Sequence, residues 1–195
     1  MLIDVLDTQI EFEPCEGVFS PCAADRGTLA MLRAAKLTPD APQKVLDLGC
    51  GWGLVGIYCA LMWGPEYVTV LDIDPNAVDC ARRNCLRNGL DALHPIVSDA
   101  YDALDDAGYT LILSNPPYHA DFAVARRFIE KGFNRLKLGG RMMMVTKRRD
   151  WYRNKFISVF GGVKIDEIDG YLVFTGIKKS PSYAKGRASK RKPSS

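Results

Sequence analysis

Hydrophobic residues in this chain gather in short continuous runs, and each run is followed by glycine, proline, asparagine or aspartate. Runs of this kind are typical of strands buried on both faces of a parallel sheet. Helical spacing of apolar residues separates them, as in residues 76–87, where Asp74 and Pro75 supply an N-cap and a first-turn proline. The pattern predicts five strands, at residues 45–48, 67–71, 93–97, 109–113 and 141–146.

The end of the chain departs from this alternation. Residues 163–168 and 171–177 have strand character, and Asp169-Gly170 between them is typical of a hairpin turn. Alternating strands and helices imply parallel strands with right-handed crossovers. We therefore expect an α/β fold: a mostly parallel sheet that ends in an antiparallel hairpin and carries helices on both faces.

A glycine-rich turn follows the strand at residues 45–48 and leads into a helix. Glycines let the backbone approach a ligand closely, and the helix N-terminus offers free N–H groups. Gly51 to Gly56 spells G-x-G-x-x-G, a dinucleotide fingerprint that is weak alone, and a plain strand–helix turn is the alternative. Asp47, just before Gly49, would repel a diphosphate and attract a cation such as an ammonium or a sulfonium.

Two further carboxylates stand where the next strands end. Asp72 follows the second strand, about 20 residues after the glycine turn, where an acidic residue commonly binds a ribose hydroxyl. A surface-turn carboxylate is the weaker alternative for Asp72. Asp99 follows the third strand and could accept the exocyclic amine of an adenine, although an N-cap or loop role explains it nearly as well.

The strand at residues 109–113 runs into Asn115-Pro116-Pro117-Tyr118. Two prolines remove two N–H donors and fix two φ angles, and each holds the residue before it extended. The Asn115 amide and the Pro116 carbonyl are then rigid acceptors beside the Tyr118 ring. Such a group can clamp a planar amine; the alternative is a simple tight turn.

Together, these motifs resemble the class I S-adenosylmethionine-dependent methyltransferases over about residues 17–178. The resemblance implies a seven-stranded Rossmann-like sheet and direct methyl transfer to a planar nitrogen without a metal. It implies catalytic roles for the Asn-Pro-Pro-Tyr residues, which are Asn115, Pro116, Pro117 and Tyr118. It also implies a set of cofactor-binding residues, namely Asp47, Gly49, Gly51, Gly53, Asp72, Ile73, Asp99, Ala100 and Asn115.

The N-terminal segment narrows the resemblance. Residues 17–20 and 25–29 are similar to the small-domain methyltransferases that modify guanine N2 in ribosomal RNA. In that family, Phe19, Ser20 and Tyr118 would contact the flipped base. The better known rRNA enzymes have a second, degenerate N-terminal copy of the domain, and here we expect a single copy. Protein glutamine N5-methyltransferases and adenine N6-methyltransferases acting on RNA or DNA are the alternatives. A small-molecule N-methyltransferase, an NAD-binding oxidoreductase and a non-catalytic RNA-binding module are less well supported.

The 195 residues, 47% hydrophobic and 25% charged, suit a single globular domain, either monomeric or homodimeric. We expect three segments: residues 1–30 as a strand pair and flap, 31–178 as the methyltransferase domain, and 179–195 as a tail.

The longest apolar runs are too short for a membrane span, and the acidic N-terminus is unlike a signal peptide. The 6 cysteines form no C-x-x-C pair and there are only 2 histidines, so we expect no metal site. Reduced, mostly buried thiols fit a cytoplasmic protein.

Positive charge is concentrated near the C-terminus. The formal net charge is +3, yet all 23 acidic residues precede Lys178 and 7 basic residues lie from there onward. Residues 179–195 predict a basic tail, disordered when free, that would favour a polyanion such as RNA or would simply aid solubility. A second basic cluster, Lys147-Arg148-Arg149, lies beside Trp151 and Tyr152. Since ligands bind at the carboxyl edge of such sheets, we expect this cluster to contact RNA; a solvated helical turn is the alternative.

Overall fold

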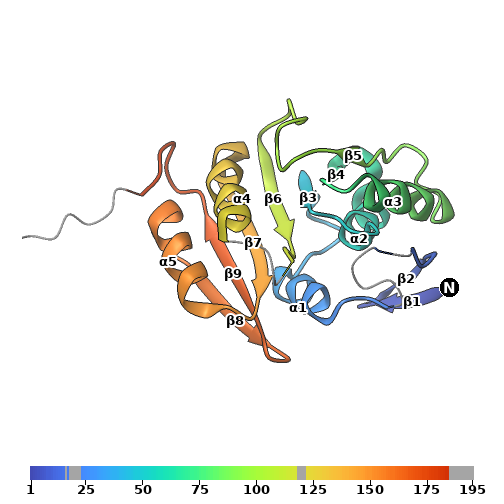
Figure 1. Ribbon diagram of the computed structural model, residues 1–195, viewed down its shortest axis with the longest axis horizontal. Coiled ribbons are helices and arrows are strands. Elements are labelled where there is room, and N and C mark those ends of the chain that lie inside the picture. The colour runs from blue at the N-terminus through green and yellow to red at the C-terminus, as the bar shows by residue number, and fades with distance from the viewer. Residues whose placement is uncertain (16, 18–22, 118–121, 185–195) are drawn as a thin grey trace, which may run out of the picture.

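The computed structural model describes residues 1–15, 17, 23–117 and 122–184 of the chain. These residues fold as alternating strands and helices (Figure 1). In chain order the elements are β1 (Leu2–Val5), β2 (Thr8–Glu11), α1 (Arg26–Ala35), β3 (Val45–Leu48), α2 (Leu54–Trp63), the short 3₁₀ helix η1 (Pro65–Tyr67), β4 (Val68–Asp72), α3 (Pro75–Arg87), β5 (Ile96–Val97), β6 (Tyr109–Ser114), α4 (Phe122–Arg135), β7 (Leu136–Thr146), α5 (Arg149–Phe160), β8 (Lys164–Ile168) and β9 (Tyr171–Ile177).

Seven strands form the main sheet, in the order β5-β4-β3-β6-β7-β9-β8. The pairs from β5 to β7 are parallel, whereas β9 runs antiparallel to both β7 and β8. Asp169 and Gly170 both have positive φ, of 51° and 77°, as a two-residue hairpin turn between β8 and β9 requires. The predicted fold class, including the antiparallel hairpin, is confirmed.

Side chains that alternate along the strands divide the core into two clusters. On β3, Val45 points into the cluster formed with α1, α2 and α3, and Leu46 points into the cluster formed with α4 and α5. Because both faces of the sheet are covered, its central strands are apolar almost throughout, as the continuous runs in the sequence predicted. Every described helix is too short or too polar to cross a bilayer.

Two strands differ in length from the prediction. The strand expected at residues 93–97 is only Ile96–Val97, because Pro95 has no N–H to donate and Leu93 closes a turn on the Leu90 carbonyl. The strand expected at residues 141–146 begins earlier, at Leu136. Its pairing with β6 is irregular near that start, so periodicity alone did not show its true length.

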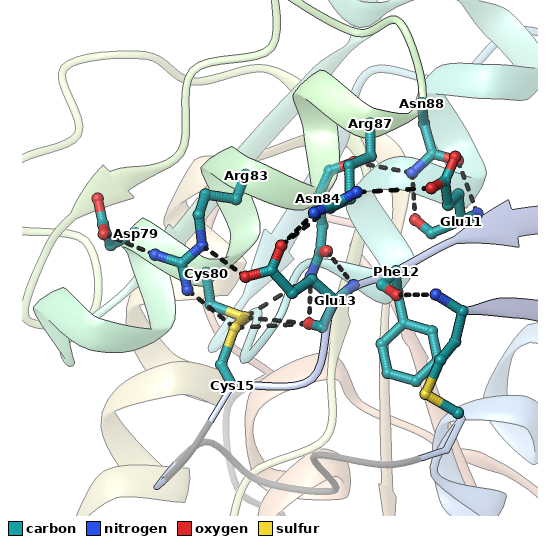
Figure 2. A network of polar contacts seen from close by, with 11 residues as sticks. Glu11, Phe12, Glu13, Cys15, Asp79, Cys80, Arg83, Asn84, Arg87 and Asn88 are labelled. Atoms are coloured by element: carbon teal, nitrogen blue, oxygen red, sulfur yellow. Dashed lines mark hydrogen bonds and ion pairs between the residues drawn. A yellow bond between two sulfur atoms is a disulfide. The ribbon is translucent and has the colours of Figure 1, made fainter.

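The N-terminal segment forms its own two-stranded sheet, β1 with β2, and then runs along α3 (Figure 2). The fully buried Asn84 joins it to the glycine-rich turn: its Oδ1 accepts from the Glu13 N–H at 2.7 Å and its Nδ2 donates to the Trp52 carbonyl at 3.1 Å. Phe12 stacks on Trp52 with ring centroids 4.9 Å apart. The domain boundary expected at residue 30 falls inside α1.

The expectation that all thiols are reduced is wrong in this structure. Cys15 and Cys80 form a disulfide that ties the N-terminal segment to α3, with Cα atoms 6.1 Å apart (Figure 2). The spacing of 65 residues carried no signal for the pair, since the contact depends on how the segment packs against the helix. Cys50, Cys59 and Cys85 are buried free thiols.

Thiol counting tests this bond. Protein denatured without reductant and alkylated should carry two fewer alkyl groups than protein reduced first, as measured by mass spectrometry. Cys80→Ser should abolish the two-group difference. Equal counts in the parent before and after reduction would show that Cys15 and Cys80 are thiols, as the sequence suggested.

The segment after β9 also departs from expectation. Residues up to Ala184 dock on α4 and α5: the Tyr183 hydroxyl donates to the Glu130 carbonyl at 2.8 Å, and its ring packs edge-on against Phe133. The Ala184 N–H donates to the Val159 carbonyl at 3.1 Å. The prediction of disorder from residue 179 is therefore wrong for residues 179–184, and residues 185–195 lie outside the described part of the chain.

Candidate active site

A cavity of about 390 Å³ opens at the carboxyl edge of the main sheet. Its volume lies within the ~300–1,000 Å³ typical of small-molecule sites. It sits where β3 lies between β4 and β6, so that successive crossovers leave β3 in opposite directions and open a crevice. The cavity brings together ten of the residues proposed from the sequence, namely Asp47, Gly49, Gly51, Asp72, Ile73, Asp99, Ala100, Asn115, Pro116 and Pro117.

Asp47 lies at the end of β3, on the wall of this cavity, and only 2% of its surface is exposed. Its Oδ2 accepts the Gly56 N–H at 2.9 Å. Burial raises the pKa of this carboxyl from 3.8 to about 7; the Gly56 hydrogen bond lowers it, and the nearby Asp72 raises it further. A cation in the cavity would favour the ionised form.

The glycine-rich turn is shaped by left-handed backbone. Gly49, Gly51 and Gly53 have φ values of 75°, 56° and 95°, a region that side chains disfavour. Gly53 begins α2 rather than lining the cavity, and a Cβ there would come within 3.1 Å of the Ala81 Cβ. Its role in this structure is close packing of the turn against α3.

Asp72 ends β4 and braces two turns. Its Oδ2 accepts the Gly51 N–H at 2.9 Å and its Oδ1 accepts the Asp74 N–H at 3.0 Å. Asp74 accepts the Asn76 N–H at 2.9 Å, which confirms it as the N-cap of α3. A carboxylate has about four acceptor positions, so Asp72 keeps capacity for ligand hydroxyls.

Farther along the same edge, the cavity becomes apolar. Ile73 is 63% exposed and Ala100 is buried, and both line the cavity with Val124 and Phe128 of α4. Asp99 also lines it, but its carboxylate pairs with Arg127. The role predicted for Asp99, accepting an adenine amine, would have to share the carboxylate with this guanidinium.

Asn115 follows β6, and its two amide ends are in different situations. Its Nδ2 donates to Asp25 Oδ1 at 2.7 Å and to Thr28 Oγ1 at 3.0 Å. Its Oδ1 is buried and accepts no hydrogen bond from the described residues. A buried carbonyl without a donor is costly, so this oxygen marks a place where a ligand N–H is favoured.

The structure describes only some of the other residues predicted to bind the base that receives the methyl group. Pro116 is buried and Pro117 is exposed at the cavity. Phe19, Ser20 and Tyr118 lie outside the described residues. Their proposed contacts with the target base stay predictions.

The basic cluster after β7 is exposed but already has partners. Arg148 lies over the Phe122 ring, 4.9 Å from its centroid, and that ring stacks on Trp151. Arg149 pairs with Glu167 at 2.8 Å. Tyr152 is 5% exposed and belongs to the core, so the suggestion that it contacts RNA is wrong.

Sequence reasoning missed several residues at the cavity. Asp25 and Thr28 belong to the stretch 25–29 that carried the family resemblance, but nothing in the sequence indicated that Asp25 caps α1 or that both residues contact Asn115. Val124 and Phe128 reach the cavity from α4, and no local pattern distinguishes them from ordinary core residues.

Comparison with known proteins decides the family. The model of the methyltransferase small domain matches residues 9–175. The chain belongs to this family. In sequence it is 31% identical, over 86% of its length, to the ribosomal RNA small subunit methyltransferase C of Pseudomonas putida, of which it covers 51%. It is 28% identical over 71% of its length to an uncharacterized protein of Bacillus subtilis, of which it covers 69%.

Among solved structures, the chain is similar to a 16S rRNA N2 methyltransferase of T. thermophilus, in complex with AdoMet and guanosine. The TM-score is 0.81 and the identity 27%, over 92% of this chain and 50% of that one. The family and fold predicted from the sequence are confirmed, and the expected methyltransferase class and cofactor agree with these findings. The chain spans about half the length of the rRNA methyltransferases it matches.

Proposed function

We propose that this methyltransferase uses S-adenosylmethionine to methylate the exocyclic N2 of a guanine in ribosomal RNA. The observation that carries the proposal is the buried Oδ1 of Asn115 at the edge of the cavity, which accepts no hydrogen bond from any residue that the structure describes. An acceptor held rigidly beside a cofactor-sized cavity suits a planar amine, whose N–H would complete the missing hydrogen bond.

The residues present fit the cofactor. Asp47 would face its cationic amino-acid end, Asp72 would accept from the ribose hydroxyls, and Ile73 and Ala100 would flank the adenine. When bound, S-adenosylmethionine would supply a methyl group on cationic sulfur. On transfer, N2 would form the new N–C bond, the electron pair of the broken S–C bond would stay on sulfur, and one N2 proton would pass to solvent. Asn115 and Pro116 would hold the amine in line, and such positioning is worth up to about 7–11 kcal/mol in favourable cases.

The acceptor class is supported by the relatives. The P. putida protein is named a small-subunit rRNA methyltransferase, and the T. thermophilus structure contains both AdoMet and guanosine. A base must leave its stack to enter such a site, which costs a few kcal/mol and favours flexible or single-stranded RNA. Arg148 and Arg149 are exposed at the same edge, and the Arg149–Glu167 pair is a surface pair that a phosphate could displace. A cytoplasmic location would suit this substrate.

The test is transfer of a labelled methyl group from S-adenosylmethionine, with small ribosomal subunits, naked rRNA, tRNA, DNA and release-factor protein offered in parallel. Label should enter an rRNA fraction, and nucleoside analysis should identify N2-methylguanosine. N6-methyladenosine would move the reaction to adenine. Label only in protein would replace the proposal with glutamine methylation, and no label in any nucleic acid or protein would point to a small-molecule acceptor.

A further inference from the structure

The amide of Asn115 is held by a helix that lies far away in the sequence. Asp25 is the N-cap of α1, and its Oδ1 accepts from the Thr28 N–H at 2.9 Å and the Thr28 hydroxyl at 3.3 Å. The same Oδ1 accepts from Asn115 Nδ2 at 2.7 Å, across 90 residues. Thr28 Oγ1, 7% exposed as a residue, accepts a second hydrogen bond from Nδ2 at 3.0 Å.

These partners decide which end of the amide faces the cavity. The two ends of an asparagine amide have nearly the same shape, so hydrogen bonds select the orientation. An ionised carboxylate only accepts hydrogen bonds, and it therefore selects the NH₂ end. With Nδ2 turned toward Asp25, Asn115 Oδ1 is the end that has no partner in the described part of the chain.

We propose that Asp25, assisted by Thr28, is a positioning residue that fixes Asn115 with its oxygen toward the acceptor amine. The inference rests on the proposed function and adds the residues that prepare its acceptor. The Asp25 charge has a second effect: hydrogen bonds in a chain polarise one another, so the carboxylate strengthens Oδ1 as an acceptor. That gain is largest in the transition state, when the amine nitrogen becomes positive and its N–H more acidic.

Asp25 also caps a helix, and the experiment must separate the two roles. Asparagine is about as good an N-cap as aspartate, so Asp25→Asn keeps the cap and the side-chain size. It removes the charge and offers Asn115 both an oxygen and an NH₂ group. The Asn115 amide can then flip by about half a turn, which exchanges the positions of its Oδ1 and Nδ2. A residue needed only as a cap would tolerate this change.

Steady-state methyl transfer should therefore respond to Asp25→Asn in a specific way. We expect kcat to fall about tenfold or more, as for loss of a charge-assisted hydrogen bond, with little change in cofactor affinity or thermal unfolding. Thr28→Val removes the hydroxyl and should lower kcat less than Asp25→Asn does. Thr28→Ser keeps the hydroxyl and should have the kcat of the parent. Asp40→Asn, in the loop before β3 at the amino edge of the sheet, is the charge-matched control and should behave as the parent.

Parent-like kcat in Asp25→Asn would overturn the inference and leave Asp25 a cap. If kcat, cofactor affinity and unfolding temperature all fall together in Asp25→Asn, Asp25 has a structural role and the positioning role is also rejected.

An NMR measurement keeps this test independent of the acceptor. The Asn115 side-chain NH₂ signal, assigned by its loss in Asn115→Ala, should be protected from solvent exchange in the parent and exposed in Asp25→Ala. Protection without methyl transfer to any acceptor would sink the proposed function but retain the contact. Unprotected protons in the parent would overturn the positioning role whatever the acceptor is.

Discussion

Asn115→Ala should lower kcat for methyl transfer by about 10²- to 10³-fold, the cost of removing one pre-placed hydrogen-bonding group from a transition state. The reason is geometric: Asn115 Oδ1 is buried and finds no donor among residues 1–15, 17, 23–117 and 122–184, while its Nδ2 is held by Asp25 and Thr28. Alanine removes the acceptor for the amine but leaves the other walls of the cavity, including Asp47 and Asp72, in place. Cofactor affinity should therefore change little.

The measurement combines single-turnover transfer of labelled methyl groups with calorimetric titration of S-adenosylmethionine. Asn134→Ala on α4, outside the cavity, is the matched control and should keep both values. Equal losses of transfer and cofactor affinity would contradict the role given to Asn115, since a residue that acts on the acceptor amine affects the transition state rather than cofactor binding.

The arrangement of the site could be predicted from the sequence because parallel strands end at one edge. Once the apolar runs were recognised as strands, the polar residues at or just beyond their carboxyl ends, Asp47, Asp72 and Asn115, had to lie near one another. The same logic placed Arg148 and Arg149 at that edge. Local chemistry also identified the Asp74 cap and the Asp169-Gly170 turn, since each depends on only a few neighbouring residues.

Contacts between distant segments could not be predicted in this way. The Asp25–Asn115 hydrogen bond spans 90 residues, and the Cys15–Cys80 bond spans 65. Either one depends on how a whole element packs against the sheet. The pairing of Asp99 with Arg127 and the docking of Tyr183 are of the same kind: the residue types permit many partners, and packing selects one.

We expect the ionisation of Asp47 to have opposite effects on two properties: as pH rises, the free protein becomes less stable and cofactor affinity increases. In the unfolded chain its pKa is near 3.8, and in the fold burial raises it to about 7. The folded state thus holds the proton more tightly. The Asp47 carboxyl therefore makes its full contribution to the free energy of unfolding below pH 3.8, where it is protonated in both states. This contribution is lost as pH rises through 7, and the free energy of unfolding falls by about 4 kcal/mol.

Binding reverses this trend because a cationic ligand favours the carboxylate. Below pH 7 the ligand must displace the Asp47 proton, so cofactor affinity should weaken by up to about tenfold for each pH unit. In Asp47→Asn the group does not ionise. We expect that variant to bind S-adenosylmethionine about 10- to 100-fold more weakly at pH 8, with most of the pH dependence gone. Without cofactor, it should be more stable than the parent at that pH.

Calorimetric titration from pH 5.5 to 8.5, with denaturant unfolding of the free protein at the same pH values, measures both effects. Asp79→Asn, at an exposed carboxylate that pairs with arginines on α3, is the control and should retain the parent's pH profile. If parent and Asp47→Asn share one pH profile for cofactor affinity, Asp47 does not face the cationic end of the cofactor. A buried charge that destabilises the fold is relieved when a neutral amide of the same shape replaces it, so the free variant should then be the more stable protein at pH 8. If it is instead less stable than the parent, the Asp47 charge stabilises the fold and the predicted pH dependence of stability is wrong.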